Sequence, residues 1–205
     1  ALEKIGVEKT LDMLTRADVA LFVLDITKDI STQERHLAGV LQASKVSVII
    51  VANKWDLIPN KTTTSVNDYE KIIRGFMPQL KYAPVLFTSA LTGQRAQDTF
   101  NLITKVFQTR FTQLSNDETR QFMSKAIVRH KPMRGKGVKS PKITSFTQTH
   151  INPPVFTLEV NLSRTDSLAT AYVRFLENIL REQYDFTGTP IRIKIEVERK
   201  SHTTY

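Results

Sequence analysis

The sequence contains no cysteine among its 205 residues, and this absence excludes disulfide bridges and thiolate metal ligands. It also has no apolar run near the roughly 18 residues that a membrane-spanning helix needs. The four histidines, at positions 36, 130, 150 and 202, show no spacing typical of metal ligands. We therefore expect no metal site and no membrane partner, and the missing cysteine weakly favours a reducing compartment.

Acidic residues are absent from one long segment, because no Asp or Glu lies between Glu118 and Glu159. The basic residues inside it are Arg120, Lys125, Arg129, Lys131, Arg134, Lys136, Lys139 and Lys142. The chain has a net charge of +9, of which +3 falls in residues 1–112 and +6 in residues 113–205. A basic segment without acids attracts polyanions, most often phosphate backbones, although charge can also simply keep a loop soluble.

Residues 1–112 alternate between helical and strand patterns. Unbroken apolar runs predict buried strands at 19–25, 46–52 and 85–88. Apolar residues at helical spacing predict four helices. The first contains Val7, Leu11 and Leu14, the second follows the capping-box pair Ser31 and Glu34, and the others lie at 66–77 and 94–109. This alternation is typical of a parallel sheet with helices on both faces, the α/β class.

Residues 113–205 have a different texture, with elements expected in the order α-β-β-α-β. A capping box at Ser115 and Glu118 begins a helix to about residue 129, and 130–142 reads as a loop rich in proline, glycine and charge. Strands are expected at 142–148, 155–160 and 191–197, and a helix at 167–183. In the second of these strands Phe156, Leu158 and Val160 alternate with Thr157 and Glu159. In the last strand, strict alternation predicts that Ile191, Ile193, Ile195 and Val197 face inward and that Arg192, Lys194 and Glu196 face outward. We expect two domains, 1–112 and 113–205, with the boundary at 110–115.

Polar side chains follow two of the buried strands in the first domain. Asn53, Lys54 and Asp56 end the run "VIIVANKWDL" at 48–57, where parallel sheets bind their ligands. A carboxylate there can accept two hydrogen bonds from adjacent N–H and NH2 groups, as guanine presents and adenine does not. The lysine stem can lie along a ring face, and the asparagine amide can tie neighbouring loops. A plain polar turn is the alternative.

The next strand supplies a second loop. "VLFTSALTG" at 85–93 ends its strand at Thr88 and continues with Ser89, Ala90 and Leu91. Their backbone N–H groups can reach a base carbonyl. Either short motif alone is weak evidence, but the two at successive strand ends, with a helix between them, are strong evidence for a base-binding site.

These motifs and their flanking phrases resemble one family. N-K-x-D followed by S-A is similar to the guanine-specificity pair of translation-factor-like GTPases. "RADVALFVLD", "VANKWDL", "YAPVLFTSALTGQ", "PPVFTLEVN", "RFLENILRE" and "GTPIRI" resemble, in order, the second GTPase domain and the KH-like domain of the Der (EngA) family. The similarity covers nearly the whole chain, and its C-terminal phrases are the most family-specific.

The resemblance implies a partial P-loop-type GTPase domain followed by a KH-like α/β domain. It carries over Asn53, Lys54 and Asp56 as the guanine-reading motif, and Ser89, Ala90 and Leu91 as the second base-contacting loop. The family it resembles has two consecutive GTPase domains and acts in maturation of the large ribosomal subunit. GTP or GDP is then the expected ligand, and ribosomal RNA and proteins of that subunit or its assembly intermediate are the expected partners. DNA is not expected, and the compartment is the bacterial cytoplasm or an organelle matrix.

The chain also departs from the family pattern. None of its seven glycines forms the G-x-x-x-x-G-K-[ST] phosphate loop, so this chain alone is not expected to hydrolyse GTP. Asp185 and Gly188 have the D-x-x-G spacing of a γ-phosphate sensor but lie in the second domain, where we interpret the match as chance. We expect the phosphate and magnesium elements upstream of Ala1, because residues 1–16 resemble the helix after the second switch.

The second domain offers basic residues, but not the nucleic-acid clamp of a KH domain. A KH domain clamps nucleic acid with G-x-x-G, and the nearest candidate, Gly135-x-Gly137, is one residue short. The RNA-binding candidates are Lys131, Arg134, Lys136, Lys139 and Lys142. Two alternatives compete with the leading interpretation. One is a GTPase-dead RNA-binding module with a vestigial pocket, and the other is a protein adaptor whose basic loop binds acidic partners.

Overall fold

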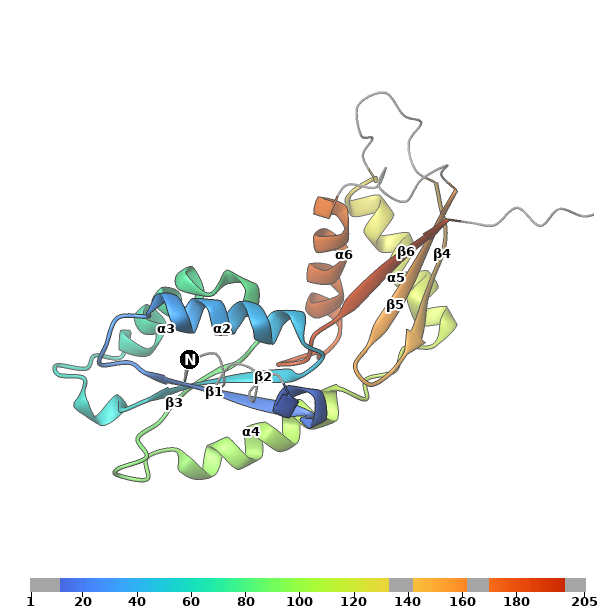
Figure 1. The fold of residues 1–205 in the computed structure, drawn as a ribbon. Helices are drawn as coiled ribbons and strands as arrows, with labels where there is room; N and C mark the ends of the chain where they lie inside the picture. Colours follow the sequence, from blue (N-terminus) through green and yellow to red (C-terminus); the bar gives the residue numbers. More distant parts are fainter. Residues whose placement is uncertain (1–11, 133–141, 162–169, 198–205) are drawn as a thin grey trace, which may run out of the picture. The chain divides into compact units, whose positions relative to one another are not determined.

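The computed structural model describes residues 12–132, 142–161 and 170–197, and its chain forms two units (Figure 1). The first unit contains residues 1–110 together with residues 186–190. The second contains residues 111–185 and 191–205. The chain therefore leaves the first unit after Arg110, and five residues near its C-terminus belong to that unit again. The sequence had assigned those five residues to the second domain.

The first unit is built on a parallel sheet in the order β1-β2-β3. The strands are β1 (Val19–Asp25), β2 (Ser47–Asn53) and β3 (Val85–Phe87). Helices α2 (Thr32–Ala43) and α3 (Ser65–Phe76) lie on one face of the sheet, and α4 (Ala96–Thr109) lies on the other (Figure 1). The predicted parallel sheet with helices on both faces is confirmed.

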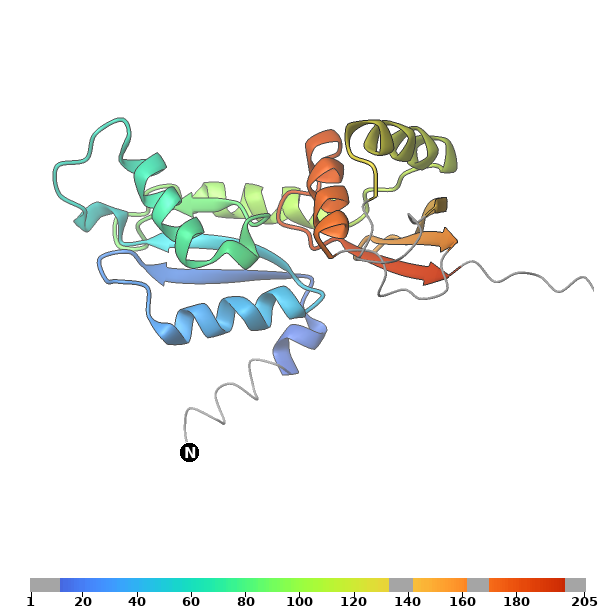
Figure 2. The ribbon, with the colours of Figure 1, turned by 90° about the horizontal axis from the view of Figure 1, so that it is seen from above.

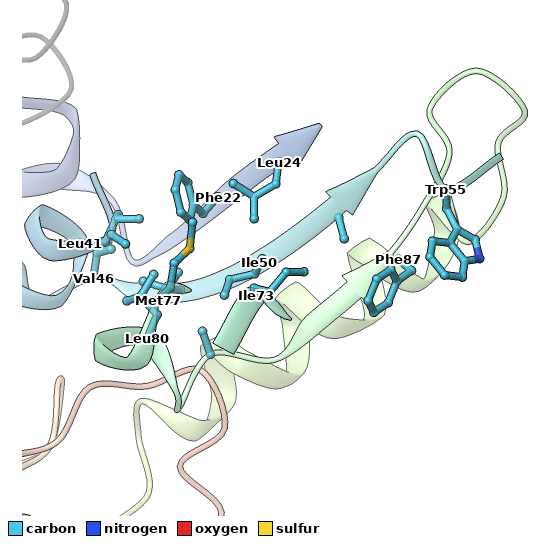
Figure 3. Packing of buried hydrophobic residues seen from close by; sticks show 14 of the residues in the cluster. Phe22, Leu24, Leu41, Val46, Ile50, Trp55, Ile73, Met77, Leu80 and Phe87 are labelled. Atoms are coloured by element: carbon cyan, nitrogen blue, oxygen red, sulfur yellow. The ribbon is translucent and has the colours of Figure 1, made fainter. Parts of the chain in front are cut away.

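The central strand explains the unbroken apolar run of the sequence. Every β2 residue from Ser47 to Ala52 is buried, because helices cover both of its faces. On the side of α2 and α3, Ile50 packs in a core with Phe22, Leu24 and Phe87 (Figure 3). On the side of α4, a smaller cluster holds Ile49, Val51 and Val106.

Residues 186–190 enter the first unit at the amino end of its sheet. The backbone N–H of Gly188 donates to the carbonyl of Tyr82 at 3.0 Å, and its own carbonyl accepts from the N–H of Val48 at 2.8 Å. Gly188 has a φ of +71°, and a Cβ there would lie 2.8 Å from Val106 Cγ1. Glycine is therefore required twice, for its backbone angle and for the close approach.

A buried polar network fixes the same segment. The hydroxyl of Thr189 lies 3.1 Å from that of Ser47 and 2.8 Å from that of Thr109. Arg110 is buried, and its guanidinium donates to Ser47 Oγ at 3.0 Å. The side chains of this network satisfy one another, as buried polar groups must.

The second unit has a mixed sheet in the order β4-β5-β6. β4 (Lys142–His150) pairs antiparallel with β5 (Val155–Asn161), which pairs parallel with β6 (Arg192–Val197). Helices α5 (Asn116–Arg129) and α6 (Thr170–Gln183) cover one face of this sheet (Figure 2). The predicted α-β-β-α-β order is confirmed, and none of the described helices in the chain is long and apolar enough to cross a membrane.

The core of the second unit follows the predicted alternation with one exception. Phe156, Leu158 and Val160 are buried, and Phe156 stacks on Phe146 with 5.2 Å between ring centroids. Thr157 alternates with these apolar residues, yet it is only 5 % exposed. Its hydroxyl lies 3.1 Å from that of Thr149 on the neighbouring strand, so a cross-strand pair shields it.

Candidate functional site

Three strand ends meet at the carboxyl edge of the first sheet. Asp25 and Asn53 are directly paired, as the last residues of β1 and β2. β3 ends at Phe87, and the N–H of Thr88 donates to the carbonyl of Ala52 at 2.9 Å. The loops that follow these strands therefore share the edge where parallel sheets bind ligands. Gly188 lies near the opposite, amino end of β2, which supports interpreting its D-x-x-G match as chance.

Asn53 ties the two predicted loops together. Its side-chain Oδ1 accepts a hydrogen bond from the backbone N–H of Ala90 at 3.0 Å. The N–H of Trp55 donates to the carbonyl of Thr88 at 3.0 Å, which adds a second tie between the same loops. One loop therefore cannot move without the other, and the spacing of any groups that they present together is fixed.

Lys54 is held by a residue that the sequence interpretation missed. Its Nζ lies 2.6 Å from Oδ2 of Asp25, and its backbone φ of 67° is left-handed. The hydrogen bond from Lys54, followed by that from the Thr27 hydroxyl, lowers the pKa of Asp25 from 3.8 to about 2. A signal was present, because "VALFVLD" also ends a buried strand with a carboxylate.

Trp55 anchors the Asn53–Asp56 loop to the core. It begins a short 3₁₀ helix, η1 (Trp55–Leu57), and is only 7 % exposed. Its ring contacts Phe87 with 4.8 Å between centroids and meets Tyr69 edge-on at 5.5 Å. Lys61 covers the ring at 5.4 Å and donates to the Trp55 carbonyl at 2.7 Å. The residue between Lys54 and Asp56 thus positions both.

Asp56 differs from the other polar residues of the site. It is half-buried on η1, and within the described part of the chain its carboxylate has no hydrogen bond or ion pair. Leaving a carboxylate partly desolvated without a partner is unfavourable, so a ligand with paired N–H donors suits it. Asp25, by contrast, already binds Lys54.

The second loop uses part of its hydrogen-bonding capacity internally. Ser89 donates its N–H to the carbonyl of Gln94 at 3.1 Å, and Ala90 donates to Asn53. Leu91 is 86 % exposed, and its N–H makes no hydrogen bond with another described residue. Of the three N–H groups in the predicted loop, the one on Leu91 is therefore available without rearrangement. Those on Ser89 and Ala90 hold the loop in shape.

The basic candidates are only partly placed. Lys131 follows α5 and is exposed, and Lys142 is the exposed first residue of β4. Arg134, Lys136 and Lys139, like Gly135 and Gly137, lie outside the described residues. In the described ranges no group of three or more His, Cys, Asp or Glu side chains could hold a metal ion.

Two protein families match the sequence. The family described as "Elongation factor Tu GTP binding domain" matches residues 7–152. The family described as "KH-domain-like of EngA bacterial GTPase enzymes, C-terminal" matches residues 113–196. The matches overlap at 113–152, and there the structure places α5 and β4 in the second unit.

Curated relatives share both parts of the chain. It is 36 % identical over 193 residues to the protein named GTPase Der of Lactobacillus acidophilus, covering 93 % of this chain and 43 % of the relative. It is 34 % identical over 192 residues to GTPase Der of Chloroflexus aggregans, covering 94 % and 42 %. With GTPase Der of Clostridium kluyveri it shares 35 % over 199 residues, covering 97 % and 44 %. The chain thus spans less than half the length of these relatives.

Proposed function

The chain belongs to the family of elongation factor Tu-type GTP-binding domains and carries the KH-like domain of EngA GTPases, and from this premise we propose that it is the guanine-reading part of a Der-type GTPase acting in assembly of the large ribosomal subunit. The resemblance expected from the sequence is confirmed by the two family matches and by the relatives named GTPase Der.

Guanine recognition rests on one observation above all: beside a fixed second loop, the carboxylate of Asp56 has no partner among the described residues. In this proposal Asp56 accepts hydrogen bonds from the ring N–H and the exocyclic amine of guanine. Lys54, held by Asp25, lays its stem along the base, and the Leu91 N–H meets the base carbonyl. Asn53 contributes by holding the two loops at a fixed distance.

The free edge of β1 supports a longer GTPase domain. Among the described residues β1 pairs with β2 alone, and its other edge presents unpaired backbone groups. Leu21 and Val23 on this strand are 42 % and 56 % exposed, although their partners Ile49 and Val51 are buried. A further strand and a covering helix would shield them. We assign phosphate binding, magnesium ligation and GTP hydrolysis to that further part of the full-length protein.

Nucleotide selectivity tests the guanine proposal. In the full-length protein, Asp56→Asn should weaken GTP binding and shift preference toward xanthine nucleotides. The amide presents a donor where guanine needs an acceptor, whereas xanthine has a carbonyl there. Losing a charged hydrogen bond at a desolvated site costs about 1.5–3 kcal/mol. Asp29→Asn, at an exposed position on the loop after β1, is the matched control.

Undiminished GTP affinity in the Asp56→Asn variant would instead identify the loop as a polar turn. An equal loss with Asp29→Asn would show that the effect is one of net charge.

Docking on ribosomal RNA is the second half of the proposal. It is supported by the acid-free basic segment and by the net charge of +6 on residues 113–205. Partners would be RNA and proteins of the large subunit or its assembly intermediate, in the bacterial cytoplasm or an organelle matrix. Sedimentation of the full-length protein with large subunits tests it. If the protein does not co-sediment with large subunits at any ionic strength, in the presence of either GTP or GDP, the adaptor alternative is favoured.

A further inference from the structure

Three aromatic rings cluster between α5 and α6 in the second unit. His130 is the C-cap residue directly after α5, and its ring centroid lies 5.0 Å from that of Phe175 on α6. It stacks on Tyr172 at 6.1 Å with 27° between the planes. Tyr172 and Phe175 are themselves 5.6 Å apart. The rings therefore form one contact group, built from the end of one helix and the first turns of another.

Exposure changes in steps across this cluster. Tyr172 is only 3 % exposed, Phe175 is half-buried and His130 is exposed. The buried tyrosine supports the imidazole from within, so the His130 ring is held by packing while part of it faces water. An aromatic ring held in this way offers a stacking surface at low cost in side-chain entropy.

The charged residues that flank the exposed ring along the chain are basic. Lys125 and Arg129 lie on α5, and Lys131 follows His130 directly. Arg129 pairs with Glu182 on α6 at 2.6 Å. Lys125 and Lys131 form no ion pair with another described residue. Glu182 on α6 is paired with Arg129, and no acid occurs between Glu118 and Glu159, so Lys125 and Lys131 are available to a phosphate backbone.

We propose that His130, supported by Tyr172 and Phe175, is a stacking platform for an unpaired RNA base, with Lys125 and Lys131 contacting the adjoining phosphates. This inference rests on the proposed docking to ribosomal RNA and adds to it a specific mode of contact. Binding sites for single strands combine cations along the backbone with aromatic rings on which bases stack. A site for phosphates alone would not need the aromatic cluster.

The test compares two probes on the 205-residue chain. One is a short single-stranded oligoadenylate, and the other is an abasic ribose-phosphate oligomer of the same length. Stacking on a side chain is worth enough that His130→Ala should weaken oligoadenylate binding roughly tenfold. Binding of the abasic oligomer should not change. His130→Phe keeps an aromatic face and should retain oligoadenylate affinity, and His36→Ala, at an exposed histidine on α2, is the matched control.

Each outcome separates the platform from the wider proposal. If His130→Ala leaves the binding of both probes unchanged, the platform is overturned but the RNA docking proposal stands. An equal loss for both probes, or no rescue by His130→Phe, also overturns it, because the residue would then act on phosphates or on the fold. If the unsubstituted chain binds neither probe, both the platform and the RNA docking proposal fail.

Discussion

Asp25 and Lys54 form an ion pair at the carboxyl edge of the first sheet, with 2.6 Å between Oδ2 and Nζ. The two residues are 29 positions apart in sequence, and they meet because β1 and β2 are parallel neighbours ending at the same level. The pair fixes the lysine next to Asp56 in the Asn53–Asp56 loop. The position of Lys54 in the candidate base site therefore depends on Asp25, at the end of the neighbouring strand.

Acid should break this pair only as the pH falls to about 2, below the range in which ordinary carboxylates are protonated. The pKa of Asp25 is lowered from 3.8 to about 2, so its contribution to stability is present above pH 3.8 and lost as the pH falls through about 2. Asp25→Asn should remove that part of the acid dependence of unfolding, whereas Asp29→Asn should not. An NMR titration of the Asp25 carboxyl group measures the pKa, and a value near 3.8 would contradict the pairing.

Gly188 should be intolerant of any side chain. Gly188→Ala places a Cβ 2.8 Å from Val106 and 3.1 Å from the Val48 carbonyl, at a φ of +71°. We expect the first unit to lose about 1–3 kcal/mol of unfolding free energy. Trp55 is the single tryptophan and lies in this unit, so its fluorescence in a denaturant titration reports the loss.

Gly75→Ala is the matched control. Gly75 lies within α3 with open space around its Cβ position, and alanine there should stabilise the unit by about 0.5–1 kcal/mol. Equal effects of the two substitutions would mean that residues 186–190 do not pack into the first unit.

The hydroxyl of Tyr172 should be dispensable. It is buried and has no hydrogen-bond partner among the described residues, and burial raises its pKa to about 12. Its folded-state pKa is above the ordinary 10.0, so its contribution is present below pH 10 and lost as the pH rises through about 12. Tyr172→Phe should not lower stability at neutral pH and should flatten the alkaline loss. Denaturant titrations at neutral and alkaline pH measure both, and a less stable variant at neutral pH would reveal an unseen partner.

The basic segment should dominate the salt dependence of RNA binding. Replacing Lys131, Arg134, Lys136, Lys139 and Lys142 with glutamine should weaken binding to large-subunit ribosomal RNA and flatten the logarithmic salt slope. Each lost phosphate contact reduces that slope by about 0.7–0.9. The melting temperature should stay nearly unchanged. If RNA binding and its salt slope are both unaltered, the docking surface lies instead on the sheet face around Arg192 and Lys194 or on the GTPase domain.

Local features of the fold were predictable from the sequence because they depend on neighbours along the chain. Ser31 and Glu34 form the predicted capping box, with the Ser31 N–H donating to Glu34 Oε2 at 2.6 Å, and Ser115 and Glu118 form the second. The apolar run of β2 was equally informative, since a strand covered on both faces has no polar alternation.

Long-range features were not predictable from these patterns. The five residues 186–190 belong to the first unit through contacts of Gly188 and Thr189 with β2 and α4, and no local signal marks them. Arg110 resembles a surface residue in the sequence, yet it is buried beside Ser47. The partner of Lys54 also had to come from the structure. Pairing across strands depends on topology, which short motifs do not encode.

We propose that the Asp56 carboxylate binds the exocyclic amine of guanine, and a comparison of GDP with IDP, which lacks that amine, measures this contact by itself. The chain spans less than half the length of its curated relatives, so full-length proteins that differ only at position 56 should be titrated with both nucleotides. The unsubstituted protein should bind GDP more tightly than IDP by about 1.5–3 kcal/mol, as expected for a hydrogen bond to a charged group. At this site Asp56→Ala should remove that preference. If Asp56→Ala leaves the ratio of the GDP and IDP affinities unchanged, Asp56 does not bind the exocyclic amine.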